Sequence, residues 1–150
     1  MASNLNPSAR TSVVGVIDPD AYAASTVTTG WIDMQDWFAL LAVLMVGDFV
    51  ATSTLNAKFQ QATAADGTGA KDVTGSAITA LTQAGTDDNK QALINLNSGD
   101  LDFNNGFRWV RLSATLGTAG ADFGAVVVGL DRRYGAATDG DSATVDEVVS

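Results

Sequence analysis

The sequence predicts an all-β protein, specifically an antiparallel β-sandwich, and three observations support this class. Thr and Val are abundant, and β-branched side chains fit a pleated surface. Glu147 is the only Glu among the 17 acidic residues, and an Asp-rich chain favours turns over long surface helices. Short apolar stretches recur at near-regular spacing between Gly- and Asp-containing turns, which is typical of a sandwich and also compatible with a jelly-roll-like arrangement.

The length of 150 residues suits one domain with a single hydrophobic core. Apolar residues make up 46% of the chain and charged residues 17%, as in ordinary globular proteins. We expect an extended polar arm over residues 1–12, one β-sandwich domain over 13–135 and a flexible acidic tail over 136–150. The tail would stay loosely held unless a partner ordered its valines.

The first half of the chain contains three candidate strands. Residues 13–17 and 26–34 each carry a short apolar stretch, and Gly30 is expected to mark a bulge or a tight bend. The apolar run 37–46 fits either a helix or a central strand buried on both faces. We favour the strand, because an alternating strand follows closely and a hairpin over 38–62 is the simplest connection.

That alternating strand separates a larger apolar face from a polar one. Its two faces consist of Ser53, Leu55, Ala57, Phe59 and Gln61 on one side, and of Thr52, Thr54, Asn56, Lys58 and Gln60 on the other. A loop at 66–71 follows, with two glycines able to adopt positive φ. Further strands are expected at 76–83, 91–96, 108–116 and 121–130, with turns at 84–90, 97–100 and 117–120.

Composition excludes several function classes. A net charge of −9 disfavours nucleic acid as a partner, because phosphate backbones are bound by clusters of Lys and Arg. The absence of Cys excludes disulfides and thiolate chemistry, and the absence of His removes the commonest general base and transition-metal ligand. The apolar run 37–46 is far shorter than the ~20 residues that span a bilayer. We therefore expect no enzyme activity, no cofactor and no membrane partner.

Two carboxylates stand near two aromatic side chains. Asp33 and Asp36, close to Trp31 and Trp37, could form a glycosidase-like acid pair with sugar-stacking platforms. The two acids are three residues apart at an expected strand end, and no other catalytic group is near them in sequence. Strand termination and solvation account for them better.

Two further motifs have ordinary explanations. Asp139, Asp141 and Asp146 resemble a calcium loop, but the Gly and Glu spacings of an EF-hand are missing, so a flexible tail is the better interpretation. The loop 66–71 lacks the GxxxxGK[ST] pattern of a phosphate-binding loop. We interpret it as a connection between strands.

The best candidate for a functional surface is a group of basic and aromatic residues. Arg and aromatic side chains are enriched in protein interfaces, and Arg binds carboxylates in a bidentate manner. The alternative is that these arginines pair within the chain, with Asp102, Asp122 or Asp131. The candidate interface residues are Arg108, Trp109, Arg111, Arg132, Arg133 and Tyr134.

Four segments carry a resemblance to a known group of proteins. They are GTGAKDVTGSAIT at 67–79, QALINL at 91–96, GFRWVRLSATLG at 106–117 and AVVVGLDRRYGAA at 125–137. Over residues 26–137 the chain resembles small virion structural proteins of tailed bacteriophages and related prophages. The resemblance implies a decoration or cement protein, made in the host cytoplasm and located on the capsid exterior. Its implied partners are the major capsid protein and copies of itself in a homo-oligomer.

Two alternatives remain open from the sequence. The same β module could be a tail or head–tail junction component, present in far fewer copies. It could also be a carbohydrate-binding module that uses Trp31, Trp37 and Trp109 as stacking platforms. Exposed tryptophans whose fluorescence responds to glycans would favour the second alternative.

Overall fold

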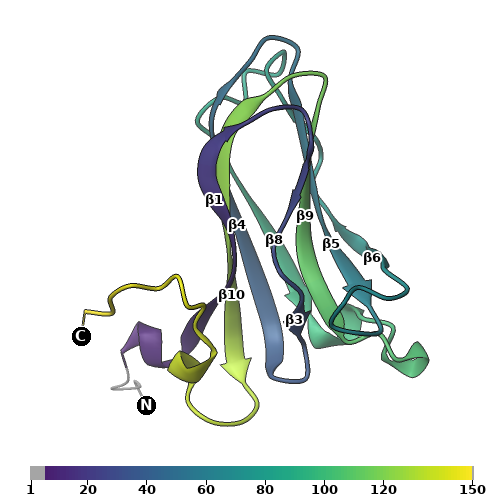
Figure 1. The fold of residues 1–150 in the computed structure, drawn as a ribbon, viewed down its shortest axis with the longest axis vertical. Coiled ribbons are helices and arrows are strands. Elements are labelled where there is room, and N and C mark those ends of the chain that lie inside the picture. Colours follow the sequence, from purple (N-terminus) through teal and green to yellow (C-terminus); the bar gives the residue numbers. More distant parts are fainter. Residues whose placement is uncertain (1–5, 150) are drawn as a thin grey trace.

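A computed structural model describes residues 6–149 of the chain. Its secondary structure consists of β strands and short 3₁₀ helices (Figure 1). No helix among the described residues is long and apolar enough to cross a membrane. The elements are η1 (Pro7–Ala9), β1 (Thr11–Tyr22), β2 (Thr26–Thr28), β3 (Ile32–Asp33), β4 (Trp37–Phe49), β5 (Thr54–Ala62), β6 (Lys71–Ala77), β7 (Leu81–Thr82), β8 (Gln91–Asn97), η2 (Ser98–Asp100), η3 (Phe103–Asn105), β9 (Trp109–Gly117), β10 (Ala121–Arg132) and η4 (Ala137–Gly140).

The strands form two antiparallel sheets with jelly-roll topology. One sheet has the order β1-β10-β4-β8, and the other has the order β2-β9-β5-β6, with β3 added on β9 and β7 on β5. The antiparallel pairs β1/β10, β2/β9, β4/β8 and β5/β6 are nested in the sequence, so the chain folds like a long hairpin wound into two sheets. The predicted all-β antiparallel sandwich is confirmed, including its jelly-roll-like form.

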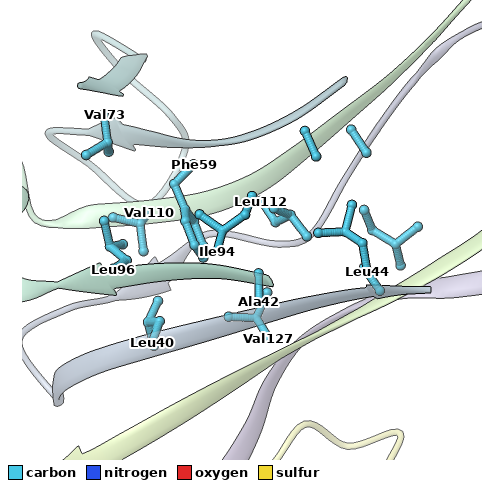
Figure 2. Close-up of a cluster of buried hydrophobic side chains, with 14 of the residues drawn as sticks. Leu40, Ala42, Leu44, Phe59, Val73, Ile94, Leu96, Val110, Leu112 and Val127 are labelled. Atoms are coloured by element: carbon cyan, nitrogen blue, oxygen red, sulfur yellow. The ribbon is translucent and has the colours of Figure 1, made fainter. Parts of the chain in front are cut away.

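The core lies between the two sheets (Figure 2). Alternate residues of each strand point inward, as the period of two requires, and most of these are Leu, Val, Ile, Ala or Phe. From the first sheet Leu40, Leu44 and Val127 face Phe59 and Leu112 of the second. All five of these side chains are at most 1% exposed.

The hairpin predicted over 38–62 is wrong. β4 pairs with β10 and β8 in one sheet, whereas β5 pairs with β9, β6 and β7 in the other. The connection between them crosses from sheet to sheet, with Thr52 at a φ of 70°. The predicted alternation is nevertheless confirmed, because Leu55, Ala57 and Phe59 are buried. The strand β5 is therefore predicted correctly, but its closeness to β4 in sequence indicates the wrong pairing partner.

The run 37–46 is indeed a strand, and it continues to Phe49. Its expected burial on both faces is wrong. Leu40, Ala42 and Leu44 are buried in the core, while Met45 on the opposite face is 59% exposed. The reason is that no second layer covers that face within residues 6–149.

Two other strands differ in their bounds from the prediction. The strand expected at 76–83 is β6, which begins at Lys71, followed by the short β7. The strand expected at 26–34 is divided into β2 and β3 around Gly30, although both parts pair with β9. The loop between β5 and β6 has its two predicted positive-φ glycines, Gly67 at 87° and Gly69 at 70°.

Two short helices near the ends of the described chain, η1 and η4, pack against the first sheet. β1 begins at Thr11, within the expected arm, and η1 and η4 lie side by side at the foot of β10 (Figure 1). The Ser12 hydroxyl donates to the Ala137 carbonyl. The Val13 N–H donates to Asp141 Oδ1 at 2.8 Å, and the Ser142 N–H donates to the Val13 carbonyl at 2.6 Å. Residues 1–5 of the expected arm and residue 150 of the expected tail lie outside the described residues.

Candidate functional site

The structure brings three of the six predicted interface residues together. Arg108, Arg133 and Tyr134 line a hollow of about 430 Å³ at one end of the sandwich. Its other lining residues come from the turn before β4 and the loop before β9, and they are Met34, Gln35, Phe103 and Gly106. Tyr134 is 75% exposed, so the hollow opens to solvent beside an aromatic ring.

Both arginines of this hollow are held by intramolecular contacts. Arg108 Nη2 donates to Asp33 Oδ2 at 2.8 Å, and the guanidinium lies 5.4 Å from the Trp109 ring centroid. The Arg133 guanidinium lies 3.9 Å from the Phe38 ring centroid, and its Nε donates to the Trp37 carbonyl at 3.3 Å. These contacts fix the two cations at the rim of the hollow.

The other two arginines of the predicted interface, Arg111 and Arg132, lie outside this hollow. Arg111 Nε donates to Gln60 Oε1 at 3.0 Å on the outer face of the second sheet. Arg132 Nη1 donates to the Ala136 carbonyl at 2.5 Å and lies 3.6 Å from Asp139 Oδ2. Intramolecular pairing of the arginines is therefore observed, but with other acids than the three expected.

The three tryptophans are poor sugar platforms as the structure places them. Trp37 is 3% exposed. The Trp31 ring is covered by Arg111, whose guanidinium carbon lies 4.5 Å from its centroid, and by Gly67, where a Cβ would come within 2.8 Å of the indole nitrogen. Trp109 has the Arg108 guanidinium beside it.

The other motifs also have structural explanations. Asp33 of the suspected acid pair accepts from Arg108 and from the Gln35 N–H at 2.9 Å. No group of three or more metal-binding side chains exists among residues 6–149. In the 66–71 loop, Asp66 Oδ1 accepts from the N–H of Thr68 at 2.9 Å and from its hydroxyl at 2.6 Å. The bond from the Thr68 N–H makes this loop an Asx turn, and the bond from the Thr68 hydroxyl lowers the pKa of Asp66.

Sequence reasoning missed the open face of the first sheet. One cross-strand row on this face consists entirely of apolar residues: Val16 pairs with Val126, Val126 with Val43, and Val43 with Leu93. This row spans all four strands, and Leu93 at its end is 60% exposed. The run 37–46 carries the signal, because residues of both its faces are apolar, but this pattern alone also fits burial on both sides.

The rows on either side of this one carry no charge either. Val13, Val128, Leu41 and Asn95 form one of them, and Gly124, Met45 and Gln91 form the other. Pro19 lies over Gly124, where a Cβ would be 2.8 Å from the Pro19 Cα. β1 thus lies beside a largely apolar groove of about 670 Å³ that includes Val43 and Val126 and is bordered by Asp20 and Asp122. We call the three rows the apolar face.

The size of the apolar face follows from sheet geometry. Four strands at ~4.8 Å spacing and three rows at ~6.7 Å spacing cover about 19 Å by 20 Å, or roughly 400 Å². Apolar patches of about 300–600 Å² are the largest on typical monomers and are often functional. The apolar face is therefore within the size range expected of a binding surface.

Comparisons with known proteins give no family. No protein-family model matches this chain, and no curated protein matches it. Among solved structures, one of infectious bursal disease virus, Gx strain, is 18% identical with a TM-score of 0.42, covering 92% of this chain and 38% of that one. The xylan-binding module CBM15 is 14% identical with a TM-score of 0.39, covering 83% and 92%. A structure of Broad Bean Stain Virus is 16% identical with a TM-score of 0.34, covering 77% and 62%.

These likenesses are too distant to support a function. All three TM-scores are below 0.5, and this chain spans only 38% of the first matched chain. The structures include both virus particles and a xylan-binding module, and one fold can serve many functions. Function has to be inferred from the surfaces of this chain.

Proposed function

We propose that this protein is a non-enzymatic virion structural protein that binds and stabilises a capsid shell, as a decoration or cement protein of a tailed bacteriophage. Its partners are the major capsid protein and copies of itself, and its location is the capsid exterior. The proposal combines the resemblance of residues 26–137 with one structural observation, the apolar face.

The apolar face supports a protein partner for a physical reason. Removing apolar surface from water contributes about 25 cal/mol per Å² of burial, and protein interfaces exclude charges from their centres. The row of Val16, Val126, Val43 and Leu93 has neither a charge nor a covering layer among the described residues. A shell surface that covers this row would gain burial without having to desolvate an ion.

The hollow beside Tyr134 is a second contact candidate for the same function. Its two arginines are already fixed at the rim, so they lose little side-chain entropy on binding a carboxylate of a neighbouring protein. Arg108 is 41% exposed despite its ion pair with Asp33. The predicted Arg/aromatic interface therefore remains available in this smaller form.

Cosedimentation with assembled shells of the encoding virus tests the proposal. We expect wild-type protein to pellet with the shells and Val43→Asp to remain in the supernatant, because a carboxylate in the central row would be buried without a partner. Asn56→Asp is the matched control, since Asn56 is exposed on the polar face of β5 and receives the same charge change. Circular dichroism verifies that both variants are folded.

Two results would contradict the proposal. Failure of the wild-type protein to bind shells would refute the function itself. Equal loss of binding for Val43→Asp and Asn56→Asp would show that added charge, and not the apolar face, is responsible.

A further inference from the structure

The sheet edges of this sandwich differ in how well they are protected against pairing with another chain. Natural edge strands are protected by bulges, Pro, charges or short length. β1 has two register shifts and Pro19, and Asp141 and Ser142 bind its Val13. In the second sheet β2 has three residues, while β6 has a register shift and begins with Lys71 and Asp72.

β8 has none of these protections. Its seven residues, Gln91–Asn97, include no charge and no Pro, and they pair with β4 in seven consecutive positions without a register shift. No strand of the described chain pairs with its other edge. Gln91, Leu93, Asn95 and Asn97 are all exposed. This edge is therefore straight and accessible, and its one carboxylate lies at the end of the strand, where Asp100 Oδ2 accepts from the Asn97 N–H at 2.7 Å.

The hydrogen bonds show which backbone groups lie at this edge. The Val46 N–H donates to the Lys90 carbonyl at 2.9 Å, in the register of the β4/β8 ladder. Because paired and free groups alternate along an antiparallel strand, residues 90, 92, 94 and 96 bond to β4. The N–H and C=O groups of residues 91, 93 and 95 therefore point outward, ready for a further strand.

We propose that β8 of one copy pairs antiparallel with β8 of a second copy about a two-fold axis at Leu93. This register places Leu93 opposite Leu93 of the second copy and Gln91 opposite Asn95. The inference deepens the self-association within the proposed function and assigns it to one edge. The two sheets become one eight-stranded sheet, and the apolar row of Val16, Val126, Val43 and Leu93 runs unbroken across both copies.

The lack of charge on β8 lets a second copy approach this edge with little repulsion. Each chain has a net charge of −9, which opposes association over most of its surface. β8 contributes only the sequence QALINLN, so no like charges face each other across the new strand pair. A strand with carboxylates at these positions would repel its own copy.

Area explains why this pairing suits a shell-binding protein. The paired edges alone are small, so dimers of the free protein should be weak. The doubled apolar face, however, covers roughly 800 Å², twice the estimate for one copy and close to the ~800 Å² that each partner buries in a standard stable interface. Pairing through β8 thus provides a surface large enough for stable docking.

Single-cysteine variants test the register directly, because the natural chain has no Cys. In Leu93→Cys the two Cα atoms would be about 5.5 Å apart, within the range for a disulfide. In Gln91→Cys the same register separates the equivalent Cα atoms by four residues, about 14 Å, beyond the reach of a disulfide. Both sites are exposed, so neither substitution endangers folding.

The variants are oxidised at high protein concentration and analysed on non-reducing gels. We expect covalent dimer from Leu93→Cys, none from Gln91→Cys alone, and a heterodimer when Gln91→Cys is mixed with Asn95→Cys. Absence of the Leu93→Cys dimer, or equal dimer from Leu93→Cys and Gln91→Cys, overturns the inference. Shell binding of the wild-type protein is measured separately, so failure of β8 pairing is distinguishable from failure of the proposed function.

Discussion

The packing of Trp37 makes the strongest prediction about the stability of the fold. Its indole ring lies between β10 and η4, at 3% exposure. A Cβ at Gly129 would come within 2.7 Å of this ring, and a Cβ at Gly140 within 2.5 Å. We expect Gly129→Ala to displace the ring and to loosen η4 from the sheet.

The expected loss of stability in Gly129→Ala follows from the lack of space for a Cβ beside the Trp37 ring. Ordinary van der Waals contact begins at 3.4 Å, so the ring must move by at least 0.7 Å, the difference between 3.4 and 2.7 Å. Overpacking of this kind costs about 1–3 kcal/mol of unfolding free energy. For a domain of this size, each kcal/mol lowers Tm by about 2–4 °C.

Thermal unfolding followed by circular dichroism measures the loss, and tryptophan fluorescence should report increased exposure of an indole. The matched control is Gly99→Ala, because nothing lies within 4 Å of a Cβ at Gly99. A Tm of Gly129→Ala equal to that of wild type and of Gly99→Ala would refute the packing described for Trp37.

Three further predictions concern the core and two titrating groups. Leu112→Ala, at a fully buried position between the sheets, should lower the unfolding free energy by about 2–5 kcal/mol in a denaturant titration, and a change below that range would contradict the core assignment. The Asp72 pKa is lowered from 3.8 chiefly by the hydrogen bond from Lys58, so its stabilising contribution is present above pH 3.8 and is lost as the pH falls through the folded-state pKa. Unfolding measured down this pH range should show a smaller loss in Lys58→Met, and an unchanged loss would rule out the pair as its source. Burial, followed by nearby carboxylates, raises the pKa of Tyr22 above 10.0, so the folded state binds the phenolic proton more tightly and stability should fall as the pH rises above 10.0. In a Tyr134→Phe background, phenolate absorbance should therefore appear at higher pH than in the unfolded chain, and coincident titrations would contradict the environment of Tyr22.

The positions of the strands were predictable from local apolar stretches and from alternation along the chain. In β5 the alternation of Leu55, Ala57 and Phe59 with polar residues identifies both the strand and its core face. In β10 and β8 the apolar stretches were also located close to their observed bounds. These local signals suffice because side-chain direction alternates in any strand, whatever its partner.

Pairing between strands and the open face were not predictable in the same way. Jelly-roll topology pairs β1 with β10, about 100 residues away or further, and no local pattern encodes such a partner. In β4 both faces are apolar, and sequence alone does not distinguish a second buried face from the open one on which Met45 is 59% exposed. The Arg/aromatic group was divided because Arg111 lies within β9 on the outer face of the second sheet, whereas Arg108, just before β9, meets Arg133, just after β10, at the hollow.

The copy number of this chain in purified virus particles tests the central claim most directly. Quantitative mass spectrometry against the major capsid protein gives the ratio of the two chains. A decoration protein should be present in proportion to the shell subunits across the whole capsid. A handful of copies per particle would instead place the chain in the tail or the head–tail junction and contradict the account.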